Sequence, residues 1–174
     1  MTPPSTAGTP ARTPGVSTPA TLAQLRALGV KCPESGGSAA IPEIAKSFEG
    51  KVTYDQNKRG TISGNTIYLD CSSFALQVYK CAGFTPSGTY SGNIFTGSQV
   101  QNIPPGDITK LGLGDLLGWM PGEDPKGPNG HVVIYIGGGQ IIDLQRSGVQ
   151  ERTLASMQDR YKYIKQLFAG NPFE

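Results

Sequence analysis

Residues 67–74 read Ile67-Tyr68-Leu69-Asp70-Cys71-Ser72-Ser73-Phe74, a change from a predicted strand to a predicted helix. The apolar residues up to Leu69 predict a strand. Asp70 predicts the N-cap of a helix that Cys71 begins, because a carboxylate there accepts hydrogen bonds from first-turn N–H groups. A thiol at a helix N-terminus lies at the positive end of the helix dipole, which favours its thiolate form. Apolar residues then recur at helical spacing before Gly83, where the helix is expected to end: Phe74, Ala75, Val78, Tyr79 and Ala82.

His131, the one histidine of the chain, begins the second informative stretch. It precedes the apolar, β-branched run Val132-Val133-Ile134-Tyr135-Ile136, which predicts a strand. Gly137-Gly138-Gly139 then predicts a turn into a second strand, so the spacing indicates a hairpin. An imidazole at this point can take the proton of a thiol and later return it to a leaving group.

Asp143 lies in the second strand of this predicted hairpin, twelve residues after His131. If no bulge intervenes, we expect the even separation to place both side chains on the same face. With a turn of two or three residues, Asp143 then lies nearly opposite His131 or one diagonal step away. A carboxylate in that place can hold one ring nitrogen, as the third member of a catalytic triad does. The candidate nucleophile, base and orienting group are therefore Cys71, His131 and Asp143.

Each of these residues also has a structural interpretation. Cysteine is among the most buried residue types, and a lone histidine at a strand start is more often a surface group or a satisfied core group. Asp143 could cap a turn, and Asp70 could serve only as the helix cap. The three candidates occurring together, in this order, favour the catalytic interpretation.

The order of the predicted elements indicates the fold class. Two helices are expected before the cysteine helix, one over Thr21–Leu28 and one that Pro42 begins from a first-turn position. Residues 51–66 and 84–112 are expected to be mostly loop, and strands dominate the rest. We therefore expect an α+β fold, with N-terminal helices and the nucleophile helix packed on an antiparallel sheet.

Length and composition set the domain organisation and exclude several classes. At 174 residues the chain is expected to form one domain, with residues 1–20, which are almost wholly Pro, Thr, Ser, Ala and Gly, as a flexible tail or linker before residues 21–174. The net charge of +2 implies neither nucleic acid nor an acidic membrane as partner. No transmembrane segment is expected, and no signal peptide is visible. Export would therefore use another route, or the chain is a fragment or a mature form.

The three cysteines leave two interpretations open. Cys71 and Cys81 share the predicted helix and would lie roughly 15 Å apart, too far for a disulfide. No spacing of cysteines and His131 predicts a zinc site, and we expect neither metal nor cofactor. Cys32 and Cys81 either form a disulfide or are both reduced and structural.

Three motifs in order carry a family resemblance: Asp70-Cys71-Ser72-Ser73-Phe74, Gly114-Asp115-Leu116-Leu117, and the run from Gly130 to Gly137. They resemble the NlpC-type cysteine peptidases, papain-like enzymes that cut peptide bonds in bacterial peptidoglycan. The resemblance extends from about Ile41 to Leu154. It implies Cys71 as nucleophile, His131 as base and Asp143 at the third polar position. It also implies action outside the cytoplasm, in the periplasm or cell wall.

The same resemblance implies three substrate-binding residues. Tyr54 falls where the family often has a tyrosine lining the site, and Asp70 and Ser72 match positions that hold the substrate amine in some members. The chain departs from the family at Ser73, where glycine is usual, and at Asp143, where His, Asn or Gln is more usual. The usual Trp-Gly-Gly pattern is also missing between Tyr54 and Asp70.

The expected function is therefore a peptidoglycan endopeptidase that cleaves stem peptides. A thiol acyltransferase or amidase on the same fold and a non-catalytic wall-binding or assembly module are the alternatives. The sequence does not distinguish an enzyme that remodels its own wall from one that serves a phage or a secretion system, or from a toxin with an immunity-protein partner. Nor does it identify the bond that is cut.

Overall fold

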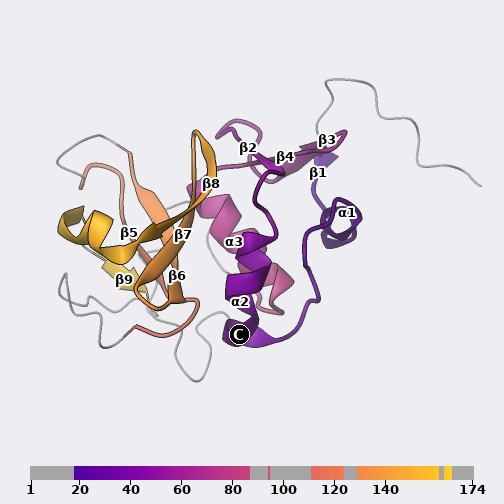
Figure 1. Cartoon of the computed structure of the whole chain (residues 1–174). Coiled ribbons are helices and arrows are strands. Elements are labelled where there is room, and N and C mark those ends of the chain that lie inside the picture. The colour runs from indigo at the N-terminus through magenta and orange to yellow at the C-terminus, as the bar shows by residue number, and fades with distance from the viewer. Residues whose placement is uncertain (1–17, 87–93, 95–110, 124–128, 161–162, 166–174) are drawn as a thin grey trace, which may run out of the picture.

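The computed structural model describes residues 18–86, 94, 111–123, 129–160 and 163–165 (Figure 1). Helix α3 (Cys71–Cys81) lies at the centre, where it contacts α2 and strands of two separate sheets. The larger sheet has five strands, and each of its neighbouring pairs is antiparallel. The predicted α+β fold, with the nucleophile helix packed on an antiparallel sheet, is therefore confirmed.

Two helices precede α3, as predicted. Helix α1 (Leu22–Ala27) begins with a capping box, in which Thr21 Oγ1 accepts from Gln24 N at 3.1 Å and Gln24 Oε1 accepts from Thr21 N at 2.9 Å. Helix α2 (Gly37–Lys46) begins five residues before Pro42, so the expected start at Pro42 is wrong. The proline lies inside the helix, where it lacks one backbone N–H. Gly37 N bonds to the carbonyl of Ala82, which attaches the true start of α2 to the end of α3.

Residues 51–66, expected to be mostly loop, contribute strands to a four-stranded sheet in the order β1-β3-β4-β2. These strands are short, and their exposed and half-buried residues give little apolar alternation from which to predict them. The strand expected before Cys71 is the longest of the four, at Thr66–Leu69. The strands are β1 (Thr18–Pro19), β2 (Val52–Tyr54), β3 (Thr61–Ser63) and β4 (Thr66–Leu69).

Strand β1 lies within the segment that composition predicted as a tail. Thr18 pairs with Ile62 and Pro19 with Thr61, and Ala20 N donates to the carbonyl of Gly60. The folded domain therefore includes residues 18–20. Residues 1–17 lie outside the described residues, and their assignment to a tail stays a prediction.

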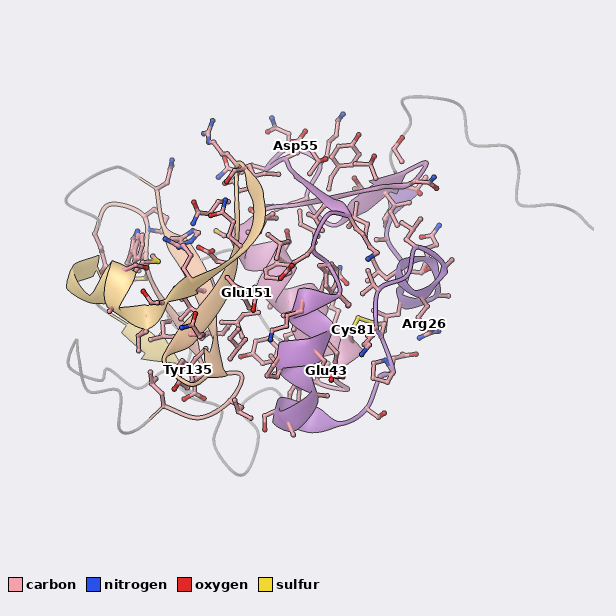
Figure 2. All side chains as sticks on the ribbon, viewed as in Figure 1. Arg26, Glu43, Asp55, Cys81, Tyr135 and Glu151 are labelled. Carbon is pink, nitrogen blue, oxygen red and sulfur yellow. A yellow bond between two sulfur atoms is a disulfide. The ribbon has the colours of Figure 1, made fainter. Side chains whose placement is uncertain are left out.

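The larger sheet has the strand order β8-β7-β6-β5-β9. One face packs on the helices through fully buried residues of the three central strands, and the other packs on a 3-10 helix at Leu154–Arg160. Glu151 reaches from β8 toward α2, where it pairs with Lys46 at 3.5 Å (Figure 2). The strands are β5 (Leu116–Trp119), β6 (His131–Gly137), β7 (Gln140–Gln145), β8 (Gly148–Thr153) and β9 (Tyr163–Lys165).

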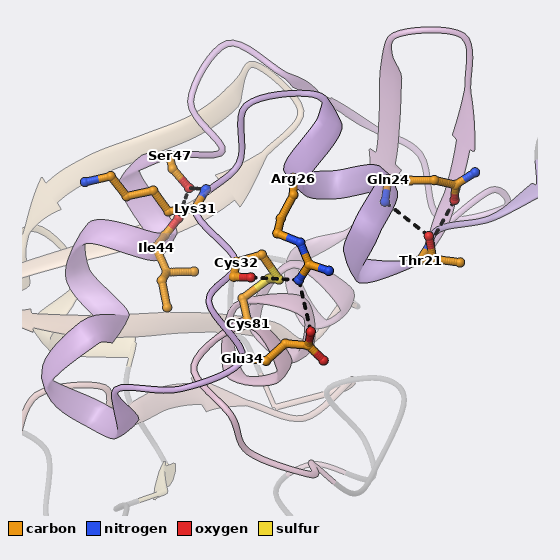
Figure 3. The surroundings of a disulfide bond; sticks show 9 residues. All are labelled: Thr21, Gln24, Arg26, Lys31, Cys32, Glu34, Ile44, Ser47 and Cys81. Atoms are coloured by element: carbon orange, nitrogen blue, oxygen red, sulfur yellow. Dashed lines mark hydrogen bonds and ion pairs between the residues drawn. A yellow bond between two sulfur atoms is a disulfide. The ribbon is translucent and has the colours of Figure 1, made fainter.

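A disulfide joins Cys32, in the loop before α2, to Cys81, the last residue of α3 (Figure 3). The structure thus resolves the alternative that the sequence left open. Arg26 supports the loop, because its Nη1 donates to the Cys32 carbonyl and to Glu34 Oε2, both at 3.0 Å. Gly83 lets the loop approach α3 closely, since a Cβ there would lie 2.9 Å from the carbonyl oxygen of Glu34.

Candidate active site

Cys71 is the first residue of α3, and Asp70 and Ser73 cap this end of the helix. Asp70 is the N-cap: its Oδ1 accepts from Ser73 N at 2.8 Å and from Ser72 Oγ at 3.0 Å. Ser73 Oγ in turn accepts from Asp70 N at 2.8 Å. The serine that replaces the family's usual glycine thus completes a capping box. Cys71 is the one cysteine outside the disulfide, and its side chain is mostly buried.

His131 joins Cys71 to Asp143. It is the first residue of β6, and it lies close enough to Cys71 for that side chain to raise the pKa of the imidazole. Its Nε2 lies 2.6 Å from Asp143 Oδ2. Because Nε2 faces the carboxylate, Nδ1 is the ring nitrogen left for the thiol. All three candidate catalytic residues of the sequence therefore meet in the structure.

A tight turn and a bulge determine where Asp143 points. Gly138 and Gly139, at φ of 60° and 73°, form a two-residue turn in the left-handed region that glycine adopts without steric cost. Tyr135 pairs with Ile141 and Gly137 with Gln140, so Ile136 is an extra residue in β6. Continued to the strand start, this register places Asp143 one diagonal step from His131.

His131 and Asp143 therefore lie on the same face of the hairpin, as predicted. The stated condition for this, that no bulge intervenes, is wrong. With a two-residue turn and no bulge, residues an even number apart would point to opposite faces of the hairpin. The bulge at Ile136 shifts the register by one residue and brings Asp143 to the face of His131.

The electrostatics of the site favour an imidazolium. Burial lowers the pKa of His131, but hydrogen bonds to Asp143 and Cys71, and the charges of both groups, raise it by more. The result is a pKa of about 9, compared with an ordinary value of 6.5. At neutral pH the site therefore favours a protonated His131 between two groups that carry negative charge when ionised.

Arg152 was not identified from the sequence, yet it contacts the candidate triad. Its Nη2 lies 2.5 Å from Asp143 Oδ2, the same oxygen that faces His131. It lies on β8 opposite Ile141, one diagonal step from Asp143, whose own partner is Gln150. Its contact with Asp143 could not be read from sequence, because it depends on the pairing register of β8 against β7.

A cavity of about 490 Å³ opens beside His131. Tyr54 lines it, as the resemblance implied, and burial followed by the charges of Cys71 and Asp70 raises the pKa of this phenol. Trp119 forms another wall, and its ring lies 5.5 Å from that of His131. Arg146 and Arg152 also face the cavity, and none of the described lining residues is acidic.

The other two predicted substrate residues are placed differently. Asp70 and Ser72 are almost fully buried and do not line the cavity. Asp70 is held by the helix cap and by Arg59, whose Nη1 lies 3.1 Å from Asp70 Oδ2. Their contact with a substrate stays a prediction. Within the described segments, no three His, Cys, Asp or Glu side chains gather closely enough to hold a metal ion.

Comparison with known sequences shows which family this chain is similar to. A sequence model of the NlpC/P60 family matches residues 57–167. A curated relative from Listeria grayi, named "Probable endopeptidase p60", is 30% identical over 117 residues, which cover 66% of this chain. The chain spans 19% of that relative's length.

Solved structures show the same fold. An NlpC/P60 family protein from Bacillus cereus ATCC 10987 superposes with a TM-score of 0.58 at 22% identity, covering 76% of this chain and 40% of that one. The NlpC/P60 domain of the peptidoglycan hydrolase SagA superposes with a TM-score of 0.54 at 22% identity, covering 75% of this chain and 99% of that one.

Proposed function

The chain belongs to the NlpC/P60 family and has its papain-like α+β fold, and on that premise we propose that it is a peptidoglycan hydrolase. Its activity would be that of an endopeptidase cutting an amide bond of bacterial stem peptides. The observation that supports this most is the contact of Cys71 with His131 and of His131 with Asp143. The names of the p60 relative and of the SagA structure support the choice of substrate class.

In the proposed mechanism, the Cys71 thiolate attacks the amide carbonyl while His131 is protonated. The backbone N–H of Cys71 lies in the first turn of α3, where the helix offers it no carbonyl four residues back, and it can stabilise the developing oxyanion. His131 then gives its proton to the leaving amine, and water releases the acyl group from the sulfur. Asp143 accepts a hydrogen bond from the imidazole throughout, which holds the ring in place.

We place substrate binding in the cavity that Tyr54 lines, beside His131. Asp70 would act on a substrate amine only through a rearrangement of the cap and of Arg59, since both its oxygens are already engaged. Ser72 faces the same limit, because its hydroxyl donates to Asp70.

The disulfide supports action outside the cytoplasm. Structural disulfides persist in oxidising compartments and are rare in the cytosol. The Cys32–Cys81 bridge is almost wholly buried and joins the loop before α2 to the end of α3. Independently of this, no helix among the described residues has the length and apolar character needed to cross a membrane.

Digestion of purified peptidoglycan tests the proposal. We expect the wild-type chain to release muropeptides whose new amino and carboxyl termini, identified by mass spectrometry, define one cut amide bond. Cys71→Ala should release none above background. Peptidoglycan that stays intact with the wild-type chain would refute the hydrolase.

The same digestion separates the alternatives. A thiol acyltransferase would transfer the acyl group to an added amine in preference to water, so the products would carry that amine instead of a free carboxyl terminus. A wall-binding module would sediment with peptidoglycan without changing its mass spectrum, and Cys71→Ala would bind as well as the wild type.

A further inference from the structure

Asp143 is the most deeply buried charged group of the site, and it has two donors on one oxygen. Its side chain has no exposed area. Oδ2 faces His131 Nε2 at 2.6 Å and Arg152 Nη2 at 2.5 Å. A buried carboxylate needs a charged partner to remain ionised. Because His131 must release its proton during the reaction, it cannot be that partner at every step.

Arg152 is itself held from two further sides. When the Gln145 side-chain amide is oriented so that its oxygen faces the guanidinium, that oxygen accepts from Arg152 Nη2 at 2.9 Å and from Nε at 3.0 Å. Nη2 also lies 2.7 Å from the sulfur of Met157, in the 3-10 helix that follows β8. With its side chain 25% exposed, the guanidinium has limited freedom to leave the carboxylate. These contacts favour a fixed structural partner over a side chain free to follow a substrate.

We propose that Arg152 is a positioning residue for the thiol chemistry, one that orients the Asp143 carboxylate and balances its charge while His131 gains and loses its proton. This inference rests on the proposed function of Cys71 and His131. One proton moves from the Cys71 thiol to His131 and then to the leaving amine. Asp143 and Arg152 neither gain nor lose one.

Arg152 also limits how firmly the imidazolium is held. By sharing Oδ2, it weakens the attraction that this oxygen exerts on the protonated ring, and its own positive charge opposes the imidazolium. Without it, His131 would be a weaker acid toward the leaving amine. Among the described residues, the groups around His131 and the Cys71 thiol on α3 include Asp143 on β7, Arg152 on β8, Trp119 on β5 and Tyr54 on β2, with Arg146 beyond Tyr54.

The test is an NMR titration of the imidazole of the full chain, which is unambiguous because the chain has one histidine. In Arg152→Met, we expect the pKa of His131 to rise further above about 9. In Arg152→Lys, which keeps the charge, it should stay near the wild-type value. Arg146→Met is the matched control, since Arg146 faces the same cavity without pairing with Asp143. We expect it to leave the pKa of His131 unchanged.

Peptidoglycan hydrolysis supplies a second readout. A positioning role predicts that Arg152→Met lowers kcat by roughly tenfold or more with little change in KM, and that Arg152→Lys recovers part of the loss. The double variant Arg152→Met with Asp143→Asn should lose little more than the worse single variant, because both act through one carboxylate.

Two outcomes would overturn the inference. An unchanged or lowered pKa of His131 in folded Arg152→Met would remove the electrostatic coupling. A raised KM with kcat and the pKa both unchanged would make Arg152 a substrate-binding residue. If Arg152→Met does not fold, Arg152→Lys decides: a pKa of His131 unlike that of the wild type would count against the role of charge. The titration needs no substrate, so it tests Arg152 even if the chain proves not to cut peptidoglycan.

Discussion

At the residue scale, the proposed chemistry depends most on His131, because it is the one imidazole of the chain and lies beside both other members of the candidate triad. Its raised pKa means that the proton needed by the leaving amine is present at neutral pH. The thiolate–imidazolium pair of a papain-like site needs that protonation state.

We expect hydrolysis to fall as the pH rises through about 9, where His131 loses its proton. The stability of the fold should follow the same group. A pKa raised from 6.5 in the unfolded chain stabilises the fold fully below pH 6.5, and this contribution is lost as the pH rises through about 9. The difference in melting temperature between the wild type and His131→Gln should therefore shrink over that range. A constant difference from pH 6 to 10 would contradict the raised pKa.

Asp143 provides the second residue-scale prediction. Asp143→Asn keeps one oxygen that can accept from His131 but removes the charge, so it should retain measurable hydrolysis. Its alkaline limit should move below pH 9, since the loss of a neighbouring negative charge lowers the pKa of His131. Asp143→Ala also removes the acceptor and should lose about 100-fold or more. Initial rates across a pH series measure both effects, and equal rates for the two variants would argue against an orienting role.

At the scale of elements, the sequence was sufficient for α3 and for the β6–β7 hairpin. Both have strong signals: a capped apolar helix after a strand, and a β-branched run before consecutive glycines. The short strands β2 and β3 and the start of α2 were missed or misplaced, because sheet pairing and the contact with the end of α3 determine them more than local preference does.

The site shows the same division between local and long-range information. Cys71, His131 and Asp143 could be identified from residue type and order. The bulge at Ile136 and the partnership of Arg152 with Asp143 could not, because both depend on strand register. This bulge leaves almost no mark on apolar alternation, since only Gly137 follows it in β6.

The Cys32–Cys81 disulfide joins α3 to the loop before α2, so removing it should lower the stability of the fold. Its sequence separation is 49 residues, for which loop-closure entropy predicts a loss of about 4 kcal/mol. The melting temperature of Cys32→Ala with Cys81→Ala should therefore fall by roughly 10 °C. Calorimetry of the double variant and of the wild type, each with and without reductant, checks this. Wild-type protein that melts at the same temperature in reductant would show that the bridge is absent or without effect.

Strand β1 leads to a prediction about the N-terminal boundary of the domain. Removing residues 1–20 deletes the strand that pairs with β3 and should lower the melting temperature. Removal of residues 1–17 keeps β1, and we expect no change from the full chain, because a segment of that composition buries little apolar surface. Thermal melts of the two truncated chains should therefore differ. Identical melts would show that β1 adds nothing to stability.

At the scale of the whole molecule, the candidate site lies where α3 meets the larger sheet. Helix α3 carries the proposed nucleophile, while β6, β7 and β8 carry the proposed base, its proposed orienting group and the arginine that pairs with that group. The helix contacts both β6 and β7, so the packing of the core also sets the position of Cys71 relative to His131 and Asp143. Destabilising the core between them should reduce hydrolysis together with stability.

The central claim is that Cys71 cuts peptidoglycan with His131 as its acid and base. The most direct test is the rate of muropeptide release by His131→Ala, compared with the wild type at equal concentration and with folding checked by circular dichroism. We expect a loss of about 1,000-fold or more, close to that of Cys71→Ala, because nucleophile and base act as a unit. Full activity in His131→Ala would contradict it, since the chain has no other imidazole to take the proton.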